Sequence, residues 1–102
     1  MKIVLVKFEN PTEGDLLIVE YADVHRGGCH SAKHTVGHGE TAAEIAAKFV
    51  HAISTDWMKE AFTAEVRGDK LKIGCTDLVS DRIVFRSHVA GNGATTVEIE
   101  EF

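Results

Sequence analysis

The sequence predicts an α+β domain in which one amphipathic helix packs on a mainly antiparallel β-sheet, in the order β-β-β-α-β-β-β-β. Two observations indicate this class. Much of the chain alternates apolar and polar residues with a period of two, which is typical of strands that cover a core with one face. One stretch, residues 40–54, instead repeats its apolar residues with helical spacing.

Three strands are expected before the helix. Residues 2–8 (KIVLVKF) are apolar on both faces and rich in β-branched residues, which favours a strand that is buried on both sides or covered by a neighbour. The pair Asn10–Pro11 ends this strand, and residues 16–25 form the second. The pair Gly27–Gly28 predicts a tight turn, after which residues 29–36 return as the third strand.

The start of the helix carries the clearest local signal. Thr41 and Glu44 have the spacing of a capping box, in which each side chain accepts a hydrogen bond from the backbone N–H of the other residue. The alanine-rich residues that follow favour a helix. One stripe of this helix should face the sheet, and it comprises Ala42, Ile45, Ala46, Phe49, Ala52 and Ile53.

Four strands are expected after the helix, because the period of two returns. They cover residues 62–67, 70–75, 82–89 and 95–100. Cys75 alternates in phase with Leu71 and Ile73, which indicates a core position. The pair Asn92–Gly93 predicts a two-residue hairpin between the last two strands.

Size and charge restrict the class of partner. With 102 residues the chain forms one domain, residues 1–102. Its formal net charge is −5 and its eleven basic residues are scattered, which argues against a nucleic-acid surface. No stretch approaches the roughly 20 apolar residues of a membrane span. We therefore expect neither nucleic acid nor membrane as a partner, and we interpret the N-terminus as a strand rather than a signal peptide.

Three segments together resemble a known kind of protein: GETAAEIAAKFVHAI, FTAEVRGDKLKIGCTD and VAGNGATTVEIEEF. The pattern is similar to a small module that recurs in tail sheath and tail-associated proteins of tailed phages, and it covers roughly residues 35–102. The resemblance implies a structural protein of a virion, made in the host cytoplasm, whose copies contact each other or other virion proteins. The first strands and the histidine-rich segment have no counterpart in it.

Residues 24–41 hold four of the six histidines and one of the two cysteines. A helix would stack His30, His34 and His38 on one face, but the surrounding glycines disfavour a helix. In a strand, residues four apart lie about 13 Å apart, which is too far for the three to bind one ion at about 2 Å each. We interpret them as a row on one strand face at a surface or interface. Its protonation should weaken any homo-oligomer between about pH 7 and pH 5, with little effect of a chelator.

A metal site remains the alternative for this segment. His25 and Cys29 flank the glycine turn and could approach each other across the hairpin, with His30 as a third ligand and zinc as the cofactor. Outside this possibility we expect no cofactor. The spacing lacks the paired two-residue gaps of a zinc finger.

The sequence offers no arrangement for catalysis, so we expect a protein that is not an enzyme. Cys29 and His30 are adjacent, and neighbouring strand residues point to opposite faces, so they cannot act as nucleophile and base. Further interface candidates are Trp57 and Met58, which close the end of the core or anchor a partner, and Phe102 on an acidic last strand.

Three functions follow from these observations. The first is a structural or assembly protein of a phage particle, in the tail or associated with it, that acts through self-association or docking. The second is a small acidic phage protein that binds and inhibits a host protein. The third is a metal-binding module built on the histidine-rich hairpin.

Overall fold

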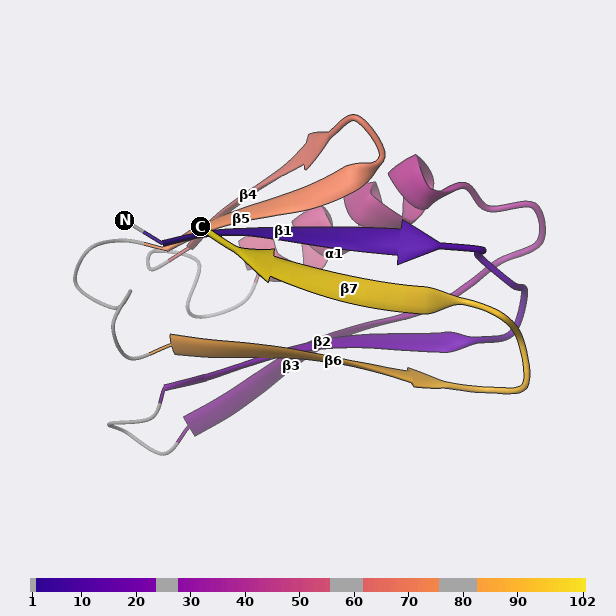
Figure 1. Cartoon of the computed structure of the whole chain (residues 1–102), viewed down its shortest axis with the longest axis horizontal. Coiled ribbons are helices and arrows are strands. Elements are labelled where there is room, and N and C mark those ends of the chain that lie inside the picture. The colour runs from indigo at the N-terminus through magenta and orange to yellow at the C-terminus, as the bar shows by residue number, and fades with distance from the viewer. Residues whose placement is uncertain (1, 24–27, 56–61, 76–82) are drawn as a thin grey trace.

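The computed structural model describes residues 2–23, 28–55, 62–75 and 83–102, and within them it confirms the predicted α+β class and element order (Figure 1). The elements are β1 (Lys2–Glu9), β2 (Leu16–Asp23), β3 (Gly28–Thr35), α1 (Ala42–Thr55), β4 (Phe62–Arg67), β5 (Lys70–Cys75), β6 (Ile83–Ala90) and β7 (Thr96–Glu101).

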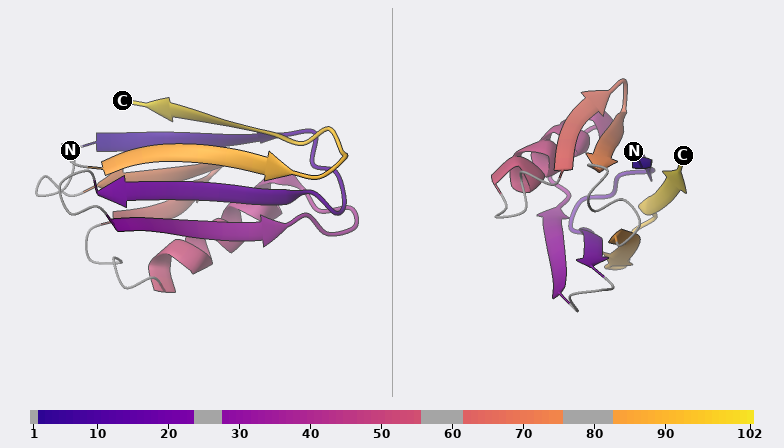
Figure 2. Two further views of the ribbon diagram at one scale, coloured as in Figure 1. Left: turned by 90° about the horizontal axis from the view of Figure 1, so that it is seen from below. Right: turned by 90° about the vertical axis from the view of Figure 1, so that its left-hand side faces the viewer.

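The strands divide between two antiparallel sheets. Sheet A has the order β4-β5-β1-β7, and sheet B has the order β3-β2-β6. Seen along the strands, sheet A forms one layer, and sheet B together with α1 forms the other (Figure 2). The helix lies beside β4 of sheet A and β3 of sheet B, so it closes the side of the core where these two edge strands stand apart.

The core lies between the inner faces of the two layers. The predicted helical stripe is confirmed, since Ile45, Ala46, Phe49 and Ile53 are buried. The ring of Phe49 stacks on that of Phe8, with centroids 5.4 Å apart, and so joins the helix to β1. Cys75 is buried as predicted.

The outer face of β1 differs from the expectation of burial on both sides. Val4 and Val6 point inward and are fully buried, whereas Leu5 between them is only partly buried and Lys7 is exposed. No helix or strand in the described ranges covers this outer face (Figure 2). Sheet A therefore presents an open surface made by β4, β5, β1 and β7.

The predicted hairpin at Asn92–Gly93 is wrong. β6 belongs to sheet B and β7 to sheet A, so residues 91–95 cross from one sheet to the other. Residues 10–15 make the opposite crossing, from β1 to β2, at the same end of the molecule (Figure 1). The two crossing loops meet there, and a local turn signal could not report this contact because it joins residues about eighty positions apart.

The buried carboxylate of Asp15 joins the two crossing loops. The residue is only 2% exposed, and its side chain accepts hydrogen bonds from the N–H groups of Gly93 (3.0 Å) and Thr95 (3.2 Å). Thr12 adds two more links, because its N–H donates to Thr95 Oγ1 and its own Oγ1 accepts from the Ala94 N–H. The backbone of Asp15 also pairs with Val36, just beyond β3.

Space around this carboxylate requires glycine at position 93. A Cβ atom there would lie 2.5 Å from Asp15 Oδ2 and 2.5 Å from Thr12 Cγ2. The hydrogen bond from the Thr95 side chain lowers the pKa of Asp15 below its ordinary value, and the N–H groups of Gly93 and Thr95 act in the same direction against the effect of burial. Asp15 is therefore ionised in the folded protein at neutral pH.

The capping box at the start of α1 is confirmed. The Glu44 N–H donates to Thr41 Oγ1, and the Thr41 N–H donates to Glu44 Oε1, both over 3.2 Å. These bonds satisfy N–H groups that the first turn of a helix otherwise leaves without a partner.

We predict that Asp15→Asn destabilises the fold at pH 7, because the amide keeps one acceptor oxygen and turns an NH₂ group toward the second backbone N–H. The lowered pKa means that the carboxylate stabilises the fold fully above its unfolded pKa of roughly 3.9 and loses this effect as the pH falls through the folded value. Urea denaturation from pH 7 to pH 2 should therefore show a difference from wild type that shrinks below about pH 4.

The control for this series is Asp69→Asn, in the exposed turn between β4 and β5. A loss of the same size in both variants, or a difference from wild type that does not change with pH, would contradict the role given to Asp15.

We predict that Thr41→Ala lowers the free energy of unfolding by about 1 kcal/mol, because the Glu44 N–H loses its acceptor. Thr55→Ala is the matched control at the other end of α1, since the Thr55 hydroxyl donates back to carbonyls of its own helix and caps no N–H group. Chemical denaturation measures both variants, and an equal loss in the two would show that capping is not the cause.

Candidate functional site

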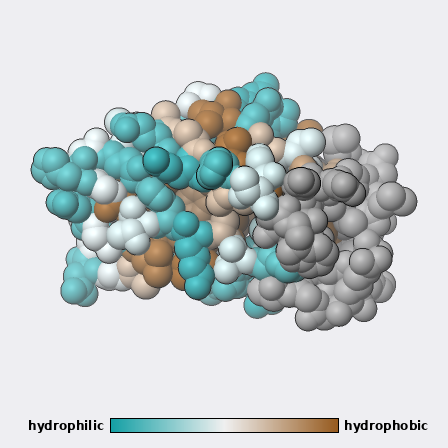
Figure 3. Space-filling model, turned by 180° about the vertical axis from the view of Figure 1, so that it is seen from behind, coloured by the Kyte–Doolittle hydropathy of each residue, from teal (hydrophilic) through white to brown (hydrophobic). Residues whose placement is uncertain are grey.

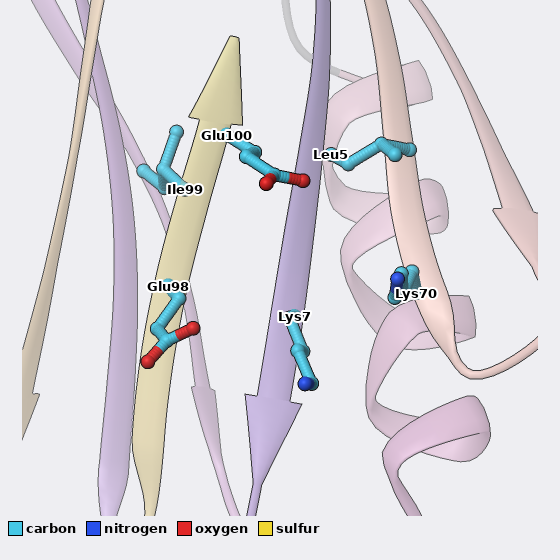
Figure 4. Close-up of a pocket in the computed structure, with 6 residues that line it drawn as sticks. All are labelled: Leu5, Lys7, Lys70, Glu98, Ile99 and Glu100. Carbon is cyan, nitrogen blue, oxygen red and sulfur yellow. The ribbon is translucent and has the colours of Figure 1, made fainter.

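The outer face of sheet A carries its charges in two aligned rows. In the first row, Lys7 on β1 lies between Lys70 on β5 and Glu98 on β7. The second row places Leu5 between Lys72 and Glu100 in the same way. Figure 4 shows the glutamates on β7 beside Lys7 and Leu5, with Lys70 on the opposite side. On the edge strand β4, Arg67 continues the first row beside Lys70, and Glu65 continues the second row beside Lys72. The charges on β5 are thus basic, those on β7 are acidic, and β4 carries one of each sign.

Some of these charges are paired within the chain. Lys7 Nζ lies 3.0 Å from Glu9 Oε1, and Lys72 Nζ lies 3.2 Å from Glu65 Oε1. The hydrogen bond and charge of Glu9 raise the pKa of Lys7, and the charge of Glu98 adds to them. Across the described residues, no ion pair involves Lys70, Glu98 or Glu100. These three charges are available to a partner.

The face has small hollows. One, of about 140 Å³, is lined by Thr63, Ala64, Glu65 and Lys72. A larger one is a pocket of about 200 Å³, lined by Leu5, Lys7, Lys70, Glu98, Ile99 and Glu100 (Figure 4). Small-molecule sites usually enclose roughly 300–1,000 Å³ and are mostly apolar. This hollow is smaller and edged by charges, so it suits contact with a surface better than enclosure of a ligand.

Phe102 lies on the same outer face. Its N–H donates to the Ile3 carbonyl (2.7 Å) and its carbonyl accepts from the Ile3 N–H (3.3 Å), so the pairing with β1 continues beyond the end of β7. The side chain stands beside Ile3 in a third row and the residue is 68% exposed. This interface candidate is therefore placed where a partner can reach it.

The histidine row differs from the expectation. β3 ends at Thr35, so His38 lies in the following turn, exposed and 3.4 Å from Glu13. His30 and His34 share a strand face with buried Ala32, which is the inner face of sheet B. The ring of His30 stacks on Tyr21, with centroids 5.8 Å apart. Two members of the row thus point toward the inner side of sheet B and are only partly exposed.

His34 holds the turn between β3 and α1. Its Nε2 lies 2.6 Å from Glu40 Oε1, which also accepts the Gly37 N–H at 3.0 Å. Both side chains of the pair are mostly buried. Burial by itself raises the pKa of Glu40, but the hydrogen bonds from His34 and Gly37, with the charges of His34 and Lys48, leave it below its ordinary value.

The metal hypothesis concerns residues that are mostly outside the described part. His25 and the side chain of Cys29 lie outside the described residues, and so do Trp57 and Met58. Within the described ranges, no three His, Cys, Asp or Glu side chains lie close enough together to hold a metal ion. The sites proposed at His25, Cys29 and His30 and at Trp57 and Met58 stay predictions.

Figure 3 shows the side of the molecule that carries α1. Where Figure 3 is coloured, hydrophilic residues cover most of this side and hydrophobic ones form only small separate groups. A search of the described helices for a long apolar span that could cross a membrane found none.

Comparison of the chain with protein-family models, with curated proteins and with solved structures found no match. The assignment of a function therefore depends on the residues of the outer face and on the sequence pattern.

Sequence reasoning misses two features. The residues around Asp15 indicate a polar turn, and nothing in them indicates that this side chain is buried. The alternating Lys70 and Lys72, and likewise Glu98 and Glu100, are visible as the polar sides of two strands. Their alignment is not visible, because it requires the register of both strands with β1.

We predict that Glu40→Gln destabilises the fold at pH 7, because the charged acceptor for His34 is lost. The pKa of Glu40 is lowered, so its contribution is present above an unfolded pKa of roughly 4.3 and disappears as the pH falls through the folded value. Glu13→Gln, beside exposed His38, is the control and should have little effect. Thermal midpoints between pH 7 and pH 3 test this, and equal shifts in both variants would refute it.

Proposed function

We propose that this protein is a non-enzymatic assembly protein of a phage particle, in the tail or associated with it, that acts by self-association or docking. The observation that carries the proposal is the open outer face of sheet A, which carries lysines on β5 and glutamates on β7, on opposite sides of β1.

The form of this face favours a protein as the partner. A surface with both signs of charge in separate halves is complementary to a surface with the reverse arrangement, and such complementarity gives specificity and orientation. Leu5, Ile3 and Phe102 add apolar area in the same face. Nucleic acid would instead require a continuous basic surface.

The virion setting is supported by the resemblance of residues 35–102 to tail sheath and tail-associated modules. It implies copies of the same chain or other virion proteins as partners, and the virion as the location. The rival function, inhibition of a host protein, is favoured by the acidic net charge of −5. The two functions predict different behaviour of the purified protein. An assembly protein requires contact between its own copies, whereas an inhibitor of a host protein does not.

The test is the molar mass of untagged protein by light scattering over a range of concentrations. We predict a mass above that of the monomer. Because His30 and His34 lie on sheet B, away from the outer face of sheet A, this mass should be retained from about pH 7.5 to pH 5.5, in place of the weakening expected from the histidine row. Raising the salt should lower the mass, since exposed charges are screened.

Two results would contradict this proposal. A monomer at every concentration would favour the inhibitor function. Dissociation by a chelator, with bound zinc in the untreated sample, would favour the metal-binding module and restore the site at His25, Cys29 and His30.

A further inference from the structure

The charges on the outer face of sheet A are arranged so that a second copy of the chain could pair with them. In each of two rows, a lysine on β5 and a glutamate on β7 lie at equal distances on either side of β1. Neighbouring strands are about 4.8 Å apart, so each lysine and glutamate are separated by roughly 10 Å across the face.

We propose that two copies of the chain pack with the outer faces of sheet A against each other, about a two-fold axis that runs along β1. This inference rests on the proposed function and names its contact surface and its partner. Rotation by 180° about such an axis brings β7 of each copy over β5 of the other. Glu98 then faces Lys70 of the second copy, and Glu100 faces Lys72, with each contact made twice.

The other symmetric arrangement is unfavourable. An axis that crosses the strands within the face would bring β7 over β7, and it would place the glutamates of the two copies against each other. The charges of the face therefore select the axis along β1.

The residues near this axis are compatible with the arrangement. Leu5 and Ile3 of one copy meet their counterparts, which gives an apolar centre. Lys7 also meets its counterpart, but each Lys7 brings its own counter-charge, since Glu9 lies 3.0 Å away. In the third row, Phe102 of each copy lies over Gly74 of the other copy, next to its neighbour Thr63. Gly74 has no side chain that would block the phenyl ring.

The size of the face indicates a weak dimer. With the axis along β1, only β5, β1 and β7 of the two copies overlap, and three strands with four rows of side chains cover about 14 Å by 20 Å, or roughly 280 Å². A standard interface buries about 800 Å² on each partner. We therefore expect association at micromolar or higher concentrations of protein, with strong dependence on salt because the paired charges lie near solvent.

The experiment reverses one charge on each side of the face. Lys70→Glu should weaken the dimer about tenfold, because the two-fold axis replaces two attractive contacts with two repulsive ones. Glu98→Lys should do the same. A mixture of the two variants should associate about as well as wild type, because the two reversed charges, one on each chain, then face each other with opposite signs. Sedimentation equilibrium at low salt measures each case.

Lys33→Glu is the matched control for Lys70→Glu, since Lys33 is exposed on the outer face of sheet B and its reversal changes the net charge equally. It should leave the dimer unchanged apart from a small general repulsion. Denaturation midpoints confirm that each variant is folded, and the mixture supplies a gain of association that unfolded chains could not produce.

The outcomes separate the two proposals. If wild type associates but neither reversal weakens it, the outer face of sheet A is not the contact and self-association stands. If both reversals weaken it and the mixture does not recover, the two-fold arrangement is wrong. If wild type is a monomer at all concentrations, self-association itself fails, and with it this arrangement.

Discussion

The fold depends on one buried carboxylate. Asp15 accepts the N–H groups of Gly93 and Thr95, which no strand ladder could satisfy because they lie in a loop that crosses between sheets. Leaving a buried donor such as the Thr95 N–H without an acceptor costs about 1–3 kcal/mol, so the loop at residues 10–15 stabilises the crossing at residues 91–95. This contact fastens together the two loops that cross between the sheets, and the division into two sheets determines which faces remain open.

The helix and the histidines complete the inner layer. α1 closes the core between β3 and β4, and Phe49 packs on Phe8 of sheet A and near His34 of sheet B. His34 binds Glu40 at the turn into the helix, while His30 stacks on Tyr21. His30 and His34 therefore contribute to packing within the fold. The surface proposed for contact is built instead from lysines and glutamates, which are common residues and are unusual here only in their alignment.

Under the proposed function, this alignment would give a small acidic chain a specific contact face. Such a face needs neither a deep pocket nor a large apolar patch, because the opposite charges on the two sides of β1 would specify how a partner binds. Each exposed pair contributes little by itself. In the proposed dimer the two-fold axis would make each contact twice, and in a particle with many copies the neighbouring contacts would add further stability.

The local features of the chain follow from residues close together in sequence. Alternation placed the strands, Thr41 and Glu44 placed the helix start, and the spacing of Ile45, Phe49 and Ile53 chose its inner face, because each signal lies within about two turns or one strand. Local signals could not predict four other features. These are the split into two sheets, the burial of Asp15, the inward direction of His34, and the positions of Lys70 and Glu98 on opposite sides of β1. They depend on register and on contacts between residues far apart in sequence, such as Val4 and Glu101, where the free energy is decided by burial and by satisfied hydrogen bonds in the assembled fold.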